Sequence, residues 1–278
     1  MTAPLLELDD FHVDFHLRSG TVHAVRGLSF TLGRERLGIV GESGSGKSQT
    51  GRAILGLTAP PGEVRASKLT FDGIDLLTAS KETLRHLRGR RMTMVMQDPK
   101  YSLNPIMTIG KQIMETYQAH VRASKAEARD KALAMLEAVQ IRDPQRVFSL
   151  YPHEVSGGMG QRAMIAMMLV TDPDLFIADE ITSALDVTVQ MEVLHILDEL
   201  VAERGMGLIF ISHDLKLVSS FCDRVLVMYG GKVMEELSAS ELGKASHPYT
   251  QGLLKCLPTL DSSVRPLPVL DRDPNWLV

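Results

Sequence analysis

The chain has 278 residues, a formal net charge of −4 and a sequence pI of about 6.1. A hydrophobic fraction of 44% and a charged fraction of 23% are ordinary for a folded globular protein and exclude wholesale disorder or a collagen-like build. The acidic balance argues against a dedicated nucleic-acid binder, because phosphate backbones require a basic face.

Cysteine usage and hydropathy indicate a reducing compartment and no membrane segment. The two cysteines, Cys222 and Cys256, lie far apart in apolar surroundings, which predicts core or near-core positions rather than a disulfide. We expect no signal peptide, since the first ten residues lack a basic region followed by an apolar one. No apolar run approaches the roughly 20 residues that cross a bilayer. Any membrane role is therefore expected to depend on a partner.

The first part of the chain predicts a small antiparallel sheet, followed by a strand, a glycine-rich loop and a helix. Apolar and polar residues alternate over residues 5–17 and 22–32, which is typical of strands. Residues 36–40 predict a short buried strand, and residues 47–57 have helical periodicity after a glycine-rich turn. Residues 60–63 are expected to form a loop, and residues 68–71 and 91–96 to form strands. The order of strand, glycine-rich turn and helix is the one that a phosphate site requires.

Helical character dominates residues 108–150. Ser124 and Glu127 have the spacing of a capping box at the start of a run with apolar residues at helical spacing up to residue 139. We interpret residues 98–172, approximately, as a helical subdomain inserted into a sheet domain.

The second half predicts strands that alternate with helices. Short apolar strands at residues 175–178, 207–211 and 224–228 are separated by helical stretches such as 187–204, which indicates a parallel sheet covered by helices. Residues 232–236 are expected to form a hairpin after Gly230 and Gly231. The fold prediction is an α/β domain over residues 1–257, with a mostly parallel core sheet, an antiparallel β-subdomain and the inserted helices. The proline-containing tail, residues 258–278, is expected to be extended and poorly ordered.

Residues 41–48, with the sequence Gly-Glu-Ser-Gly-Ser-Gly-Lys-Ser, match the P-loop pattern G-x-x-x-x-G-K-[ST]. Alone, such a run could be a surface glycine turn, but the preceding strand and following helix favour a phosphate site. Backbone N–H groups would surround phosphate oxygens at a helix N-terminus, with Lys47 on the β- and γ-phosphates and the Ser48 hydroxyl on Mg²⁺. The expected nucleotide contacts in this segment are Gly41, Ser43, Gly44, Ser45, Gly46, Lys47, Ser48 and Gln49.

The strand at residues 175–178 ends in two acids, Asp179 and Glu180. An isolated acidic pair is more often a capped or solvated strand end. A P-loop in the same chain favours a catalytic role, because parallel strands end beside one another at a ligand crevice. Asp179 is then expected to hold Mg²⁺, and Glu180 to orient and polarise the attacking water.

The run Val155-Ser156-Gly157-Gly158-Met159, followed by Gln161-Arg162, resembles the signature motif of ABC (ATP-binding cassette) ATPases. Ser-Gly-Gly is a common turn by itself, and its position between P-loop and acidic strand is what makes it specific. The resemblance covers residues 5–257 and implies ATP hydrolysis with Mg²⁺ between two subunits. Ser156, Gly157 and Gly158 would then cap the γ-phosphate of ATP held by the partner's P-loop, using the free N–H groups of a helix start.

The same resemblance implies roles for four further residues. Gln97 resembles the Q-loop glutamine that contacts Mg²⁺ or water, His213 the switch histidine at the γ-phosphate, and Asp186 the D-loop acid at the dimer interface. A strand-end glutamine and a structural histidine are the ordinary alternatives. Phe15 resembles the aromatic that stacks on adenine, with neighbouring His16 or a plain core role for Phe15 as alternatives.

Two longer runs resemble the subgroup that energises import of dipeptides, oligopeptides and nickel: residues 97–105, Gln-Asp-Pro-Lys-Tyr-Ser-Leu-Asn-Pro, and residues 247–254, His-Pro-Tyr-Thr-Gln-Gly-Leu-Leu. This implies two transmembrane permease subunits, a second homologous but distinct ATPase, an extracytoplasmic solute-binding protein, and a place on the cytoplasmic face of the cell membrane. The solute itself is left open, and no nucleic-acid partner is expected.

Two rival functions are weighed against transport. A non-transport ABC ATPase of DNA repair or translation would normally show tandem cassettes or a long coiled-coil insertion, and a module that only binds nucleotide would not need Glu180 and His213. The chain also departs from the family at Met159, Gly160 and Ile181, the last two of which bear on loop stiffness. Cys256, alone near the tail, cannot build the iron–sulfur centre that some relatives carry.

Overall fold

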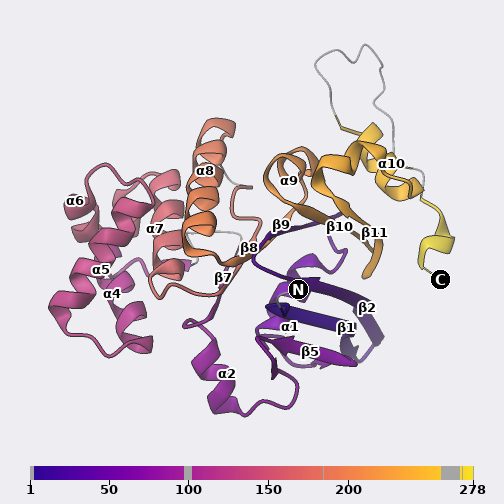
Figure 1. The fold of residues 1–278 in the computed structure, drawn as a ribbon, viewed down its shortest axis with the longest axis horizontal. Helices are drawn as coiled ribbons and strands as arrows, with labels where there is room; N and C mark the ends of the chain where they lie inside the picture. Colours follow the sequence, from indigo (N-terminus) through magenta and orange to yellow (C-terminus); the bar gives the residue numbers. More distant parts are fainter. Residues whose placement is uncertain (1–2, 97–101, 184, 258–269, 271, 278) are drawn as a thin grey trace. The chain divides into compact units, whose positions relative to one another are not determined.

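A computed structural model describes residues 3–96, 102–183, 185–257, 270 and 272–277. The chain forms two units, one of Met1–Leu77 with Phe210–Val278 and the other of Thr78–Ile209. Figure 1 labels the elements of both units. The bounds of the expected helical subdomain, residues 98–172, remain a prediction.

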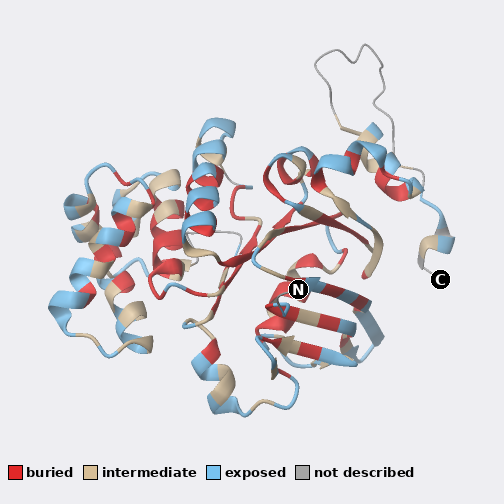
Figure 2. Cartoon of the chain, in the orientation of Figure 1, coloured by how far each residue is buried: buried red, intermediate tan, exposed pale blue. Residues whose placement is uncertain are grey.

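The antiparallel sheet predicted for the start of the chain is present in the first unit. β1 (Leu6–Leu17) pairs with β2 (Gly20–Leu32), β4 (Gly62–Arg65) and β5 (Lys68–Phe71), and β5 pairs with β6 (Ile74–Asp75). In register, Leu6 lies opposite Leu32 on one side and Phe71 on the other, and all three are fully buried. Figure 2 shows the resulting alternation of buried and exposed residues along these strands.

The expected loop at residues 60–63 is wrong at its end, because Gly62 and Glu63 belong to β4. Pairing of Phe15 with Gly62 and of Asp14 with Glu63 draws this segment into the sheet. The local signal of two prolines and a glycine is therefore overridden by strand pairing with residues about 50 positions away.

Parallel pairing in the first unit joins β3 (Arg36–Val40) to β10 (Arg224–Tyr229), which continues as an antiparallel hairpin into β11 (Lys232–Ser238). The turn contains Gly230 and Gly231 at φ of 52° and 87°, as the sequence predicted. The other elements are α1 (Lys47–Ile54), α9 (Leu215–Phe221), the 3-10 helix η2 (Ala239–Lys244) and α10 (Pro248–Lys255). β9 (Gly207–Ser212) contains the boundary between the units.

The first helix is shorter than predicted. α1 ends at Ile54 rather than at residue 57, because Gly56 takes the left-handed conformation with φ of 61°. The N–H groups of Gly56 and Leu57 then bond to the carbonyls of Ala53 and Arg52, which closes the helix.

The second unit combines one parallel strand pair with helices. β7 (Met92–Val95) pairs parallel with β8 (Leu175–Asp179). The capping box is confirmed, since the Ser124 hydroxyl accepts the Glu127 N–H at 3.2 Å and the Glu127 carboxylate accepts the Ser124 N–H at 2.7 Å. The helices are α2 (Lys81–Leu87), α4 (Ile109–His120), α5 (Lys125–Ala138), α6 (Pro144–Ser149), η1 (Pro152–Glu154), α7 (Gly157–Leu169) and α8 (Val187–Arg204). The predicted combination of parallel and antiparallel sheets with helices is confirmed.

Within the described part of the tail, the expectation of an extended chain is wrong. Pro274–Leu277 forms the 3-10 helix η3, and the Trp276 ring lies 5.6 Å from the ring of buried Tyr249. Aromatic pairs of this kind stabilise the contact by about 0.5–1.5 kcal/mol beyond their area burial.

The two cysteines occupy different environments. Cys222 is 8% exposed, beside Gly38 of β3, and burial raises the pKa of its thiol. Cys256 caps the end of α10 and is half-buried. Among the described residues, no helix combines the length and apolarity that a membrane crossing requires.

Candidate functional site

The P-loop connects β3 to α1 and surrounds a buried cation. Lys47 is 5% exposed, and its Nζ donates to the carbonyl oxygens of Gly41 and Glu42 at 2.8 Å each and to the Ser45 hydroxyl at 3.3 Å. The first turn of α1 contains no acidic residue, so none of its own side chains offsets the positive end of the helix. The loop therefore brings the Lys47 ammonium group and the N-terminus of α1 together, and both groups attract anions.

Neighbouring strands fix the path of this loop. A Cβ atom at Gly41 (φ 151°) would lie 2.1 Å from the carbonyl oxygen of Met228, and one at Gly46 (φ 98°) would lie 2.3 Å from that of Ala24. Glycine is required at both positions for space as well as for backbone conformation.

The remaining predicted contacts of the loop differ in accessibility. Ser43 and Gly44 are exposed, Ser48 and Gln49 are half-buried, and Ser45 is only 3% exposed. The accessible members are the ones that could meet a ligand directly.

Asp179 and Glu180 end β8 in the second unit. Asp179 is 3% exposed, and Glu180 adopts a left-handed φ of 50°, which is uncommon for a residue with a side chain. The Ser183 hydroxyl donates to the Glu180 carbonyl at 2.9 Å and closes the turn. Ile181, where the family often has proline, is 1% exposed and contributes to the core instead. The two acids thus have different surroundings: Asp179 is enclosed, and Glu180 lies in a strained turn.

The signature run forms the start of α7. Ser156 is its N-cap, and its hydroxyl accepts the Met159 N–H at 3.3 Å. Ser156 and Gly157 are exposed, whereas a Cβ at Gly158 would lie 2.7 Å from Cγ1 of Val189 in α8. A Cβ at Gly160 would meet nothing nearer than 3.9 Å, so this departure from the family leaves space. The helix offers its first N–H groups at an accessible surface.

The other predicted residues are placed as follows. Asp186 is the N-cap of α8, where its Oδ1 accepts the Val189 N–H at 3.0 Å. His213 is exposed and directly follows β9, and Asp214 caps α9 through the Leu217 N–H at 3.1 Å. Gln97 lies outside the described residues.

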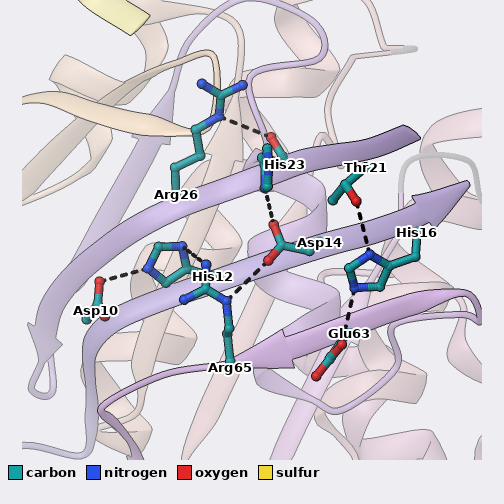
Figure 3. Close-up of polar contacts among 9 residues, drawn as sticks. All are labelled: Asp10, His12, Asp14, His16, Thr21, His23, Arg26, Glu63 and Arg65. Atoms are coloured by element: carbon teal, nitrogen blue, oxygen red, sulfur yellow. Dashed lines mark hydrogen bonds and ion pairs between the residues drawn. The ribbon is translucent and has the colours of Figure 1, made fainter. Parts of the chain in front are cut away.

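The two candidates for adenine stacking differ in their contacts. Phe15 is half-buried, and a Cβ at Gly62 would lie 2.8 Å from its ring, so glycine provides room for the ring. His16 is exposed, with Nδ1 3.1 Å from the Thr21 hydroxyl and Nε2 3.2 Å from the Glu63 carboxylate, as Figure 3 shows. Both ring nitrogens of His16 therefore have contacts in the plane of the ring, whereas the Phe15 ring packs against Gly62.

The same sheet contains a polar network that sequence reasoning missed. Asp14, 7% exposed, accepts hydrogen bonds from Nε of Arg65 at 3.2 Å and lies 2.6 Å from Nδ1 of His23 (Figure 3). Arg65 also contacts His12, which lies 2.7 Å from Asp10. Burial acts to raise the pKa of Asp14, but the contacts with His23 and Arg65 outweigh it and the pKa is lowered. Asp14 stands between two apolar residues, as an exposed residue of an alternating strand would, so the sequence contained no sign of its burial.

A strand, a glycine-rich loop closed on a buried lysine and a helix, together with a second strand that ends in two acids, define the P-loop nucleoside triphosphatase class. Residues 25–183 match the family model described as ABC transporter. The chain belongs to the ABC transporter family, in which it corresponds to the ATP-binding subunit.

Curated relatives agree with this assignment. The chain is 47% identical over 276 residues to the oligopeptide transport ATP-binding protein OppD of Salmonella typhimurium, covering 98% of this chain and 82% of that protein. OppD of Bacillus subtilis is 45% identical over 262 residues, covering 93% of this chain and 73% of that protein.

Solved structures give the same fold. The dimeric structure of MJ0796, described as a bacterial ABC transporter cassette, matches with a TM-score of 0.75 and 25% identity, covering 84% of this chain and 98% of that one. A second structure of MJ0796, described as a post-hydrolysis state bound to ADP and Pi, matches equally well, with a TM-score of 0.75.

Proposed function

We propose that this chain hydrolyses ATP to power the import of oligopeptides or a related small solute, with nickel as another possibility. The observation that carries the proposal is the buried Lys47 ammonium enclosed by the P-loop at the start of α1. Identity of 44–47% to oligopeptide transport proteins over nearly the whole chain supports the solute class.

Nucleotide binding is assigned to the P-loop and Phe15. The Lys47 ammonium and the loop N–H groups hold the β- and γ-phosphates, and the Phe15 ring stacks on adenine. The phosphate contacts comprise Gly41, Ser43, Gly44, Ser45, Gly46, Lys47, Ser48 and Gln49. This part of the proposal places ATP binding in the first unit.

Mg²⁺ is proposed as the metal. A serine hydroxyl, a buried carboxylate and a glutamine amide oxygen, from Ser48, Asp179 and Gln97, form the hard oxygen set that Mg²⁺ prefers. The 3% exposure of Asp179 fits this role, because a buried carboxylate needs a compensating cation or hydrogen-bond donors. Bound Mg²⁺ would neutralise charge on the β- and γ-phosphates.

Hydrolysis is assigned to groups that act on water and the γ-phosphate. Glu180 orients and polarises the attacking water. His213 contacts the γ-phosphate, Gln97 contacts Mg²⁺ or water, and the two report the presence of the γ-phosphate. Lys47 stabilises the charge that develops during transfer.

The proposed assembly requires further chains. ATP lies between this subunit and a homologous but distinct second ATPase, with Ser156, Gly157, Gly158 and Asp186 on the dimer interface. The pair acts on two transmembrane permease subunits at the cytoplasmic face of the cell membrane, and an extracytoplasmic binding protein delivers the solute. Residues 1–257 would form the ATPase domain, with residues 98–172 as its helical subdomain.

Replacing Glu180 by glutamine tests the catalytic assignment. Glu180→Gln should leave ATP binding intact and remove most ATP turnover, which phosphate release by the assembled complex measures. Glu203→Gln, at an exposed site of α8, is the matched control and should hydrolyse ATP normally. Turnover by Glu180→Gln at the parent rate would show that another group positions the water. Co-purification with permease subunits from detergent-solubilised membranes tests the transport part.

A further inference from the structure

The run of residues 247–254 has no role in the function proposed above, yet its start is firmly held. His247 is the N-cap of α10, and its Nδ1 accepts the Tyr249 N–H at 3.1 Å. Glu235 of β11 accepts the Ser246 N–H at 2.7 Å and the Ser246 hydroxyl at 2.9 Å through one oxygen. Its other oxygen accepts the His247 N–H at 3.3 Å. The carboxylate thus fixes the start of α10 to β11.

This anchoring places Tyr249 against the P-loop. Tyr249 is fully buried, and its hydroxyl oxygen accepts the backbone N–H of Glu42 at 3.3 Å. Burial raises the pKa of Tyr249 to about 12, so the hydroxyl stays protonated at physiological pH. A single side chain of α10 therefore satisfies a backbone donor of the phosphate loop.

The C-terminal segment holds the side chain of the same loop residue. Arg272 donates through Nη2 to Oε1 of Glu42 at 2.7 Å and through Nε to Oε2 at 3.3 Å, a two-point contact. Trp276 packs its ring 5.6 Å from that of Tyr249 and 5.8 Å from that of Tyr229. Figure 1 shows this end of the chain beside α10. We name Tyr249 and Arg272 together the Glu42 clasp.

Glu42 connects the clasp to the phosphate-binding cation. Its carbonyl oxygen accepts Nζ of Lys47 at 2.8 Å and the Ser45 N–H at 3.2 Å. A shift of the Glu42 peptide would therefore move the Lys47 ammonium and the turn that contains Ser45. Positioning groups of this kind affect ligand affinity because they hold a binding group in its productive geometry.

We propose that Tyr249 and Arg272 are positioning residues for nucleotide binding, which hold Glu42 so that Lys47 and the P-loop keep the shape that accepts a triphosphate. The inference rests on the proposed role of the P-loop. It also assigns a purpose to Tyr249 within the run of residues 247–254.

The test uses the assembled transporter and separates KM for ATP from kcat. Tyr249→Phe keeps the ring and removes the hydroxyl, and should raise KM for ATP about three- to tenfold with kcat within about twofold. Arg272→Gln, at an exposed site, should raise KM about twofold to fivefold and does not threaten folding. Tyr229→Phe is the matched control, because it removes a hydroxyl from the same aromatic cluster and should leave KM unchanged.

A second comparison shows whether Arg272 acts through Glu42. The pair Glu42→Ala and Arg272→Gln should have the KM of Glu42→Ala alone, since alanine removes both acceptors of the contact. Additive effects of the two changes would overturn the role given to Arg272. Parent KM in both Tyr249→Phe and Arg272→Gln would overturn the inference as a whole.

Lys47→Ala separates this inference from the function on which it rests. If Lys47→Ala abolishes ATP binding and both Tyr249→Phe and Arg272→Gln have the parent KM, the clasp is wrong and the P-loop role stands. If Lys47→Ala binds ATP normally, the P-loop role itself fails.

Discussion

At the residue scale, the site depends on a few side chains whose contacts are set by distant parts of the chain. Lys47 is held by its own loop, whereas Glu42 is held by Tyr249 and Arg272. The P-loop motif predicts the contacts of Lys47 within the loop. It carries no information on the contacts of Glu42 with residues more than 200 positions away. The pattern predicts which residues meet phosphate, and the fold determines what supports them.

Phe15 and His16 give a direct test of the stacking surface. Phe15→Ala should weaken ATP binding at least several-fold, because base stacking on an aromatic ring contributes about 1–3 kcal/mol. His16→Ala should have a smaller effect, because Phe15 is the proposed stacking surface and His16 contacts Thr21 and Glu63. Titration of each variant with a fluorescent ATP analogue measures the dissociation constants. The reverse order of effects would assign the stacking role to His16.

Residue-level prediction from sequence succeeded where a local pattern exists. Ser124 and Glu127 form the expected capping box because both partners lie within four residues. The network of Asp14, His23 and Arg65 was not predictable, since its members come from three strands that only pairing brings together.

At the element scale, α8 matched its predicted bounds, whereas α1 ended at Ile54, before its predicted end at residue 57. α8 has the same ends as the predicted helix because Asp186 caps its start and Gly205 terminates it in a left-handed conformation. β4 was missed because four residues with two preceding prolines carry little strand signal, and β1 alone stabilises them. The local sequence pattern thus predicts long helices and strands. A short strand such as β4 depends on pairing with a neighbouring strand.

The contact between α7 and α8 predicts different effects for the two signature glycines. Gly158→Ala should lower the free energy of unfolding by about 1–3 kcal/mol, because the new Cβ would lie 2.7 Å from Cγ1 of Val189. Gly157→Ala is the control, since no atom lies within 4 Å of its Cβ position. Adding Val189→Ala should restore part of the loss, as urea unfolding will measure. No rescue would mean that Gly158 is required for a reason other than packing.

The network that joins β1, β2 and β4 predicts a pH dependence of stability. The pKa of Asp14 is lowered below its ordinary value of 3.8, so its contribution is present above that pH and is lost as the pH falls through the folded-state pKa. Asp14→Asn should be less stable by about 1–3 kcal/mol near neutral pH, with the difference shrinking as the solution becomes acidic. Urea unfolding from about pH 7 to pH 3 measures this, with Asp130→Asn at an exposed site of α5 as the control. A difference that is constant with pH would exclude Asp14 as the titrating group.

At the scale of the whole molecule, the candidate groups are divided between the two units. The P-loop belongs to the first unit, and the acidic strand and signature helix belong to the second. In the proposed assembly the signature helix serves the nucleotide of the partner subunit rather than its own. The chain should therefore bind ATP through one part of its surface and promote turnover through another.

Ser156→Arg tests this division. The isolated chain should bind ATP with the parent affinity, while turnover by the assembled complex should fall at least about tenfold, because a bulky cation blocks the start of α7. Ser124→Arg is the matched control, since it also removes an exposed serine N-cap at a cost of about 1 kcal/mol. Nucleotide titration and phosphate release measure the two quantities. Loss of ATP binding by the isolated Ser156→Arg chain would contradict the assignment.

The unequal burial of the two cysteines has a practical consequence for measuring nucleotide binding in solution. Cys222 is shielded by its surroundings and its raised pKa disfavours the thiolate, whereas Cys256 is half-buried at the end of the helix that carries Tyr249. A maleimide dye should therefore attach to Cys256 first. The natural chain already offers a preferred labelling position on the helix that carries Tyr249, without introduced cysteines.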